Sequence, residues 1–146
     1  MTRFATAFRR SDGYYYIHAD SQTTEGVGVG VRPFLKLSIG VPAVRLGEAV
    51  CEALAASRMG IPHPTNWDSV EFPLPTMAGV KSWARFADGA QCVSIEDDNG
   101  TLTIVPHKKK GPKGGFEELK SAITVRGDLT PAAIGEAVAK AFELCE

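Results

Sequence analysis

The sequence predicts an α+β fold made of a duplicated β-β-β-β-α unit, with two antiparallel four-stranded sheets and two helices. Three observations support this prediction. Apolar and polar residues alternate with period two in several short segments, and Asp-Gly and Asn-Gly dipeptides separate them, as is typical of antiparallel hairpins. Two further segments have the apolar spacing of amphipathic helices. These two segments resemble each other, and each follows a group of predicted strands.

The first unit is expected to contain four strands and a helix. Strands are predicted over residues 4–8, 14–19, 26–31 and 34–39. Asp12-Gly13 should close the first hairpin, because both residues tolerate a positive φ. Leu46, Val50 and Leu54 recur at helical spacing and form one apolar stripe. We therefore expect a helix over residues 46–58.

A long crossing leads to the second unit. Four prolines interrupt this crossing, and we expect Trp67 and Phe72 to pin it to the core. Strands are then predicted over residues 80–86, 91–97, 101–105 and 120–126. The last helix should begin with Thr130 as its N-cap and Pro131 at its first position, and should extend to Leu144.

The two predicted helices are near copies. Residues 46–54 read LGEAVCEAL and residues 134–142 read IGEAVAKAF, an offset of 88 residues. Gly47 and Gly135 hold equivalent positions, where the missing side chain should let each helix lie close to its own sheet. We expect a single domain over residues 1–146, with an internal repeat of approximately 1–60 and 79–146, because neither half alone buries much apolar surface.

Composition and charge exclude several classes of protein. Of 146 residues, 44% are hydrophobic and 23% are charged, as in an average globular protein, which excludes a disordered tail, a collagen-like fibre and a multi-pass membrane protein. The formal net charge is -1, so no overall positive field indicates a nucleic-acid binder. Arg9-Arg10 interrupts the N-terminal apolar run too early for a signal peptide. Three widely spaced cysteines indicate reduced thiols, and we expect a cytoplasmic location.

Polar and aromatic residues around the second predicted strand are candidates for binding a partner. Tyrosine is a frequent anchor at interfaces, although an ordinary half-buried sheet followed by a self-bonded loop would also explain the pattern. The candidates are Tyr14, Tyr16 and His18 on one face of the strand, and Asp20, Thr23 and Thr24 in the loop after it.

Two charged segments are further candidates for binding a partner. Lys108, Lys109 and Lys110 begin a stretch rich in glycine and proline that extends to Lys113, and this composition predicts a mobile cationic loop. Asp97 and Asp98 form an acidic hairpin. Simple solvation of the charges is the alternative explanation for both segments.

No motif in the chain indicates catalysis or a metal site. His18, His63 and His107 lack the spacing of metal ligands, and no serine or cysteine is identifiably paired with His18 and Asp20. Gly26, Gly28 and Gly30 line one face of a predicted strand, where bare backbone suits either close packing or the approach of another molecule. We expect no enzymatic activity, no metal and no cofactor.

Residues 14–29, which read YYYIHADSQTTEGVGV, resemble a motif of the immunity proteins of contact-dependent growth inhibition (CDI) systems. The similarity continues through Pro33-Phe34, the helix at Leu46-Gly47 and the proline-rich crossing with Trp67. The resemblance implies a cytoplasmic protein that binds and neutralises the C-terminal toxin domain of an effector, often a nuclease. It implies no catalytic residues.

We therefore expect an immunity protein whose partner is its cognate CDI toxin domain, with neither membrane nor nucleic acid as the partner. The lysines would engage a carboxylate metal site of a nuclease toxin, or the acidic hairpin would face its phosphate-binding groove, and the sequence does not choose between these. The alternative is a single-stranded nucleic-acid-binding module that uses the Lys108–Lys113 loop and sheet aromatics. The layout of the repeat also resembles that of the Whirly single-stranded-DNA binders. A small enzyme that uses His18 and Asp20 is a second alternative.

Overall fold

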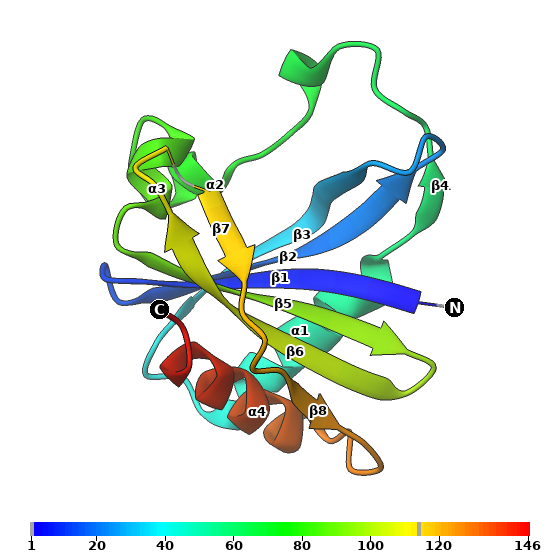
Figure 1. Cartoon of the computed structure of the whole chain (residues 1–146), viewed down its shortest axis with the longest axis vertical. Coiled ribbons are helices and arrows are strands. Elements are labelled where there is room, and N and C mark those ends of the chain that lie inside the picture. Colours follow the sequence, from blue (N-terminus) through cyan, green and yellow to red (C-terminus); the bar gives the residue numbers. More distant parts are fainter. Residues whose placement is uncertain (1, 114) are drawn as a thin grey trace.

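A computed structural model of the chain describes residues 2–113 and 115–146, and in these residues strands and helices form one mixed α/β arrangement (Figure 1). The strands are β1 (Thr2–Arg10), β2 (Tyr14–Thr23), β3 (Gly28–Ser38), β4 (Met59–Ile61), β5 (Ala90–Asp98), β6 (Thr101–Lys110), β7 (Gly115–Glu118) and β8 (Ile123–Val125). The helices are α1 (Ala43–Ala56), α2 (Leu74–Met77), α3 (Trp83–Ala87), α4 (Pro131–Glu143) and the short 3-10 helix η1 (Trp67–Ser69).

All the strands belong to one eight-stranded sheet. Its order is β3-β2-β1-β5-β6-β7, with β4 beside β2 and β8 beside β6. Neighbouring strands are antiparallel except β2 and β4, which are parallel. The two predicted four-stranded sheets are therefore wrong, because β1 and β5 pair along their whole length, with Ala5 opposite Ile95. This pairing joins the strands of the two halves edge to edge.

Several predicted elements differ from the structure, and of the predicted strand 120–126 only β8, Ile123–Val125, forms a strand. The predicted strands 26–31 and 34–39 form the single strand β3, because a bulge at Arg32 and Pro33 lets the pairing with β2 continue. The predicted strand 80–86 is largely helical, since the Ser82 hydroxyl accepts a hydrogen bond from the Arg85 N–H at 3.2 Å and caps α3. Strand β4 was not predicted, because three residues are too few to show alternation.

The lysine-rich segment was predicted to be a mobile loop, and this was wrong for Lys108–Lys110. These residues complete β6 and pair with β7, where Lys109 lies opposite Phe116. The C-terminus also contacts this part of β6. The Glu146 N–H donates to the His107 carbonyl at 3.2 Å, and the Lys109 N–H donates to the Glu146 carbonyl at 3.3 Å. Tertiary pairing of the backbone thus overrides a composition that favours a loop.

Both faces of the sheet are covered, but by different layers. Helices α1 and α4 pack on the first face over the main core, which includes Tyr15, Ile17, Val93 and Ile95. The second face carries a smaller core beside α2 and α3, formed by Phe8, Tyr16, Leu74, Phe86 and Cys92. In Figure 1 this smaller core lies toward one end of the strands, and the opposite halves of β1 and β5 have no helix in front of them.

Helices α1 and α4 are in direct backbone contact. A Cβ atom at Gly47 would overlap the Pro131 carbonyl, and a Cβ atom at Gly135 would overlap the Ala43 carbonyl. The contact is reciprocal, because Ala43 and Pro131 hold equivalent positions in the two helix copies, as do the two glycines. The prediction that each glycine lies against its own sheet was wrong, since the partner is the other helix.

The caps of the last helix follow the sequence prediction. The Thr130 hydroxyl accepts a hydrogen bond from the Ala133 N–H at 3.3 Å, and Pro131 occupies the first turn of α4. None of the described helices combines the length and the apolar character needed to cross a membrane.

We expect Gly47→Ala and Gly135→Ala each to lower the free energy of unfolding by about 3 kcal/mol or more, because the added carbon meets rigid backbone rather than a movable side chain. Urea denaturation followed by circular dichroism measures this change. Gly28→Ala is the matched control, because a Cβ atom there meets nothing within 4 Å. Equal midpoints for all three variants would contradict the backbone contact.

Candidate functional site

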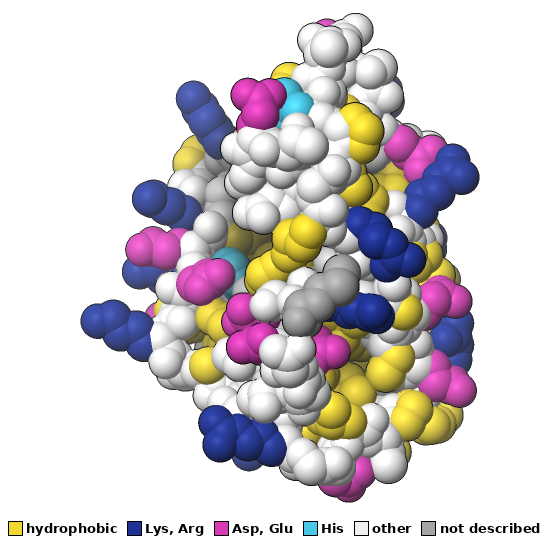
Figure 2. Space-filling model, turned by 90° about the vertical axis from the view of Figure 1, so that its right-hand side faces the viewer, with side chains coloured by type: hydrophobic (Ala, Val, Ile, Leu, Met, Phe, Trp, Pro, Cys, Tyr) yellow, Lys and Arg dark blue, Asp and Glu magenta, His cyan; other side chains and the backbone are white. Residues whose placement is uncertain are grey.

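The candidate site is the open half of the second sheet face. The register places Thr6 opposite Ser94 and Glu96 opposite Thr103, and alternate residues of each strand share this face. We call this surface the acidic shelf and define it by Thr6, Asp20, Ser94, Glu96, Asp98 and Thr103. The shelf has three carboxylates and no lysine or arginine. Its surface is therefore negatively charged, and Figure 2 shows several acidic side chains gathered near the middle of the side at which these strands end.

Asp20 is the most enclosed carboxylate of the acidic shelf. Its side chain is 27% exposed, its Oδ2 accepts a hydrogen bond from the Thr6 hydroxyl at 2.5 Å, and its Oδ1 lies 3.5 Å from His18 Nδ1. Burial raises the pKa of Asp20 above its ordinary value, while the charge of His18 and the hydrogen bond from Thr6 oppose part of this shift. A carboxyl group held in this way is typical of a functional position.

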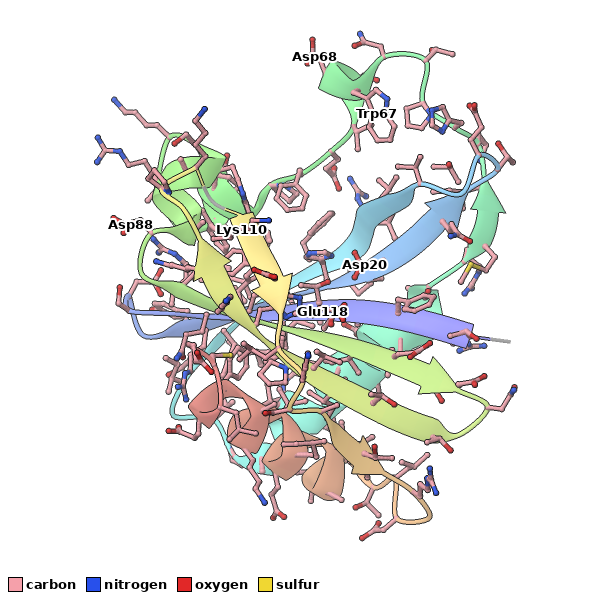
Figure 3. The ribbon with its side chains drawn as sticks, viewed as in Figure 1. Asp20, Trp67, Asp68, Asp88, Lys110 and Glu118 are labelled. Carbon is pink, nitrogen blue, oxygen red and sulfur yellow. The ribbon has the colours of Figure 1, made fainter. Side chains whose placement is uncertain are left out.

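Glu118 adds a fourth carboxylate near the shelf. It is the last residue of β7, and Figure 3 shows it and Asp20 near the centre of the molecule. The buried thiol of Cys92 lies in the smaller core on the same sheet face. Burial raises the pKa of this thiol most, and the negative charges of Asp20 and Glu118 raise it further. The negative charge of the shelf thus extends toward β7.

His18 lies beneath a group of aromatic rings. Its ring centroid is 6.0 Å from Phe8, 5.7 Å from Phe34 and 5.7 Å from Phe72. The side chain is only 5% exposed, and Nδ1 is 3.0 Å from the Ala19 carbonyl, which can only accept a hydrogen bond. His18 therefore supports Asp20 from below and offers almost no surface of its own.

Gly30 makes room for this aromatic group. A Cβ atom at Gly30 would lie 3.0 Å from His18 Cε1 and 3.1 Å from Phe72 Cε1. Of the two explanations that the sequence left open for the bare glycine face, close packing within the chain is the one that applies at this position.

Residues 62–73, which we call the arm, arch above the shelf from β4 to α2 (Figure 1). One end of the arm is held by His63, whose Nδ1 lies 3.0 Å from the Thr23 hydroxyl and whose Nε2 lies 3.4 Å from Glu25. The other end is held by two hydrogen bonds from the Arg32 guanidinium to Glu71, each 2.6 Å long. These contacts fix the arm relative to β2 and β3.

The two aromatic residues of the crossing have different environments. Phe72 packs against His18, Phe34 and Trp83, so it pins the arm as predicted. Trp67 does not, since 47% of it is exposed and its described ring contact is with His63, at 5.4 Å between centroids. Figure 3 shows Trp67 on the inner side of the arm and Asp68 on the outer side.

The predicted lysines lie at the end of β6 opposite to the shelf. Lys108 Nζ is 3.9 Å from Glu117 and Lys109 Nζ is 4.0 Å from Asp88, and all four side chains are at least 41% exposed. Such pairs contribute little to stability. A groove of about 480 Å³ lies between α3 and the β6–β7 hairpin and is lined by Ser82, Ala84, Arg85, Ala87, Asp88, Lys109, Gly111 and Pro112.

The remaining predicted residues are not brought together in one surface. Tyr14 is exposed, and the Lys36 ammonium lies 4.4 Å from its ring centroid. Tyr16 is fully buried, and burial together with Asp12, to which its hydroxyl donates a hydrogen bond of 2.7 Å, raises the pKa of Tyr16 to about 12. Tyr16 therefore supports the sheet from within.

The predicted residues at the end of β2 differ from each other in exposure, and the two predicted residues of the acidic hairpin lie on opposite faces of the sheet. Thr23 is buried, and its hydroxyl accepts hydrogen bonds from the N–H groups of Glu25 and Val27, while Thr24 is exposed in the turn. Asp98 belongs to the acidic shelf. Asp97 points to the opposite face of β5, because successive residues of a strand alternate, and its carboxylate accepts a hydrogen bond from Gly100 N–H at 2.9 Å.

Neither a metal centre nor a reactive thiol is apparent at the site. Among the described residues, no three His, Cys, Asp or Glu side chains lie close enough together to hold a metal ion. Burial raises the pKa of the Cys92 thiol and of the Cys145 thiol, which keeps both protonated.

Sequence reasoning missed four of the six residues of the acidic shelf, namely Thr6, Ser94, Glu96 and Thr103. A signal was present, because β5 alternates Cys92, Ser94 and Glu96 against the buried Val93 and Ile95. That alternation separates the two faces of β5 but does not show that β1 lies beside it. The shelf therefore depends on a strand pairing that joins residues far apart in the chain.

Comparisons with known proteins agree with this fold. The sequence profile of a family described as CDI immunity protein matches residues 33–145. A protein of unknown function from Neisseria meningitidis, NMB0488, has a similar structure, with a TM-score of 0.82 and 20% identity, covering 100% of this chain and 96% of that chain. A chain of the CdiA-CT/CdiI toxin and immunity complex from Yersinia pseudotuberculosis has a TM-score of 0.76 and 17% identity, covering 100% and 98% respectively. None of the curated proteins compared with the chain matches it.

We expect Asp20→Asn to raise the free energy of unfolding at pH 7 by about 1 kcal/mol, the usual scale for one buried polar group. The pKa of Asp20 is raised in the folded protein. Its protonated carboxyl group therefore stabilises the fold at a pH below the pKa of Asp20 in the unfolded chain, and this stability is lost as the pH rises through the pKa of Asp20 in the folded protein. Asn does not titrate, so its advantage should shrink as the pH falls toward 4. Urea midpoints between pH 4 and pH 8 measure this difference.

Asp98→Asn is the control for this prediction, since Asp98 lies on the same shelf but is exposed. It should leave the midpoint unchanged across the same pH range. A lower stability of Asp20→Asn at pH 7, or an advantage that does not vary with pH, would show that desolvation does not dominate at Asp20.

Proposed function

The chain belongs to the family of CDI immunity proteins, and from this premise we propose that it neutralises a CDI toxin domain by covering it with the acidic shelf. The family profile spans residues 33–145, which is more than half of the chain. The similar Yersinia chain comes from a complex of toxin and immunity protein, which supports a protein partner. The three free cysteines support action in a reducing compartment such as the cytoplasm.

The observation that carries this proposal is an open sheet face with carboxylates and no basic side chain. The shelf lies mainly on β1 and β5, the central strands, whose backbones are fixed by pairing on both sides. A rigid surface loses little conformational entropy on binding. Its negative charge favours a partner with a basic surface and speeds the encounter between the two.

A nuclease toxin would fit this surface. An enzyme that binds nucleic acid needs basic side chains along its substrate groove, since phosphate contacts supply much of the affinity. Asp20, Glu96 and Asp98 would pair with those side chains and occupy the space of the phosphates. Of the two arrangements that the sequence left open, this one assigns the contact to the acidic side chains rather than to the lysines.

Two observations support binding without turnover. His18, the base of the alternative catalytic pair, is 5% exposed and lies beneath three phenylalanine rings, so a substrate has no direct access to it. The carboxyl group of Asp20 has no neighbouring serine or cysteine nucleophile described at hydrogen-bond distance. We therefore propose a stoichiometric inhibitor rather than an enzyme.

The nucleic-acid alternative has little support in the geometry. Stacking of bases needs exposed aromatic rings on the sheet, yet Phe8 and Tyr16 are buried under α2 and α3. Lys108 and Lys109 lie near carboxylates, and the open sheet face is acidic and would repel phosphates. These features favour a basic protein over a nucleic acid as the partner.

Co-expression with the terminal domain of the cognate effector tests the function itself. We expect cells that make both proteins to survive, and the two proteins to co-purify in equal amounts. Death of the cells together with no detectable complex would contradict the assignment as an immunity protein.

Charge reversal tests the contact surface. We expect Glu96→Lys with Asp98→Lys to weaken binding of the toxin domain at least about 10-fold, which corresponds to about 1.4 kcal/mol, because each lysine repels the basic surface that we propose. Calorimetry at two salt concentrations measures the dissociation constant. The matched double variant Lys108→Glu with Lys109→Glu should change it less than about 3-fold. The reverse ranking would move the contact to the β6–β7 hairpin.

A further inference from the structure

Four of the eight exposed large apolar side chains among the described residues lie in or near the arm. Large apolar residues that are more than a third exposed include Val27, Met59, Trp67 and Phe72. Three of these surround the end of β2. The Val27 carbonyl accepts a hydrogen bond from the Thr23 N–H, and the Val27 N–H donates to the Thr23 hydroxyl. Met59 in β4 lies opposite Gln22, and Trp67 meets His63, which contacts Thr23, edge to face. Such clusters on a protein surface commonly mark an interaction site.

Trp67 is held in place although it is exposed. It begins η1, where the Asn66 side chain accepts a hydrogen bond from the Asp68 N–H at 3.0 Å and Ser69 Oγ donates to the Asn66 carbonyl at 2.7 Å. His63 meets the Trp67 ring edge-on, at an interplanar angle of 84°. The Trp67 side chain therefore needs little further ordering to bind a partner, and tryptophan is among the residues most enriched in binding hot spots.

The chain around Trp67 has few basic side chains, and Arg32 and Arg58 flank it. Residues 14–31 and 59–80 contain no lysine or arginine, and their four carboxylates are Asp20, Glu25, Asp68 and Glu71. Arg32 neutralises Glu71, and His63 lies near Glu25. Asp68, together with the carboxylates of the shelf, leaves negative charge near the arm, in contrast to the four lysines between residues 108 and 113.

We propose that Trp67 is a binding anchor for the toxin domain and that it receives a lysine- or arginine-bearing segment of that domain. A cation over an indole ring is attracted by the ring's electron density. The Glu25 carboxylate, 3.4 Å from the His63 ring that contacts Trp67, strengthens that preference. The arm and the shelf then bind one basic segment from two sides. This inference rests on the proposed function, because the occupant is the toxin.

Affinity measurements test the anchor. Trp67→Ala should weaken binding of the toxin domain by about 30-fold, the level that defines a hot spot, while Trp67→Phe should retain part of the affinity. Val44→Ala is the matched control, because Val44 is 45% exposed on α1, which covers the other sheet face. Urea midpoints of all three variants should stay close to that of the parent chain, so that a loss of binding cannot be attributed to unfolding.

Fluorine NMR of the parent chain gives a second readout of binding, so this test does not need a variant with weakened affinity. The chain has two tryptophans, Trp67 and Trp83, and labelling with 5-fluorotryptophan gives two signals that Trp67→Phe assigns. Unlabelled toxin should shift the Trp67 signal strongly. The Trp83 signal should move little, since Trp83 stacks on Phe86 beside the smaller core.

The outcomes separate this inference from the proposed function. If the parent chain does not bind the toxin domain at all, the proposed function fails. If it binds while the Trp67 signal stays unchanged and Trp67→Ala binds within about 3-fold of the parent, the anchor is overturned and the function stands. Double-mutant cycles between Trp67→Ala and substitutions in the toxin should find the coupling at a lysine or arginine, and coupling at uncharged residues alone would overturn the chemistry that we assign.

Discussion

The fold depends on the close approach of two helix backbones at Gly47 and Gly135. Each glycine lies where any side chain would overlap a carbonyl of the other helix, so α1 and α4 form one compact layer on the first sheet face. Strands β1 and β5 pair beneath this layer and join the two halves of the chain. That pairing then sets Thr6 opposite Ser94 and creates the acidic shelf on the other face. The surface proposed to bind the toxin is thus a consequence of how the two halves meet.

The second sheet face combines a stabilising half and an open half. Aromatic residues gather where α2 and α3 cover Phe8 and Tyr16. Because these two rings are buried, a ligand cannot reach them. The open half keeps Asp20 as a carboxylate that burial disfavours in its charged form. A sheet selected only for stability would not retain such a group, because an uncharged side chain at that position avoids the cost of desolvation. Recognition of a charged partner, as proposed for the shelf, would explain its presence.

Charge is distributed unevenly although the net charge is only -1. The lysines lie at the far end of β6, and the carboxylates lie on the shelf and beside the arm. An uneven distribution of this kind orients an approaching basic protein before contact, since the potential of a surface acts over about 8 Å at physiological salt. The net charge of the whole chain does not reveal it, because a sum contains no information on position.

The sequence by itself determined the elements whose signals are local: the hairpins at Gly13 and Gly100, the two amphipathic helices, the Thr130 cap and, through the motif at residues 14–29, the family. Tertiary structure decided what those elements meet. Gly47 was expected to face its own sheet and instead faces α4, Lys108–Lys110 pair as a strand, and Trp67 is exposed rather than buried. The physical reason is that periodicity assigns a residue to a face, whereas the neighbour of that face is fixed by contacts between distant segments.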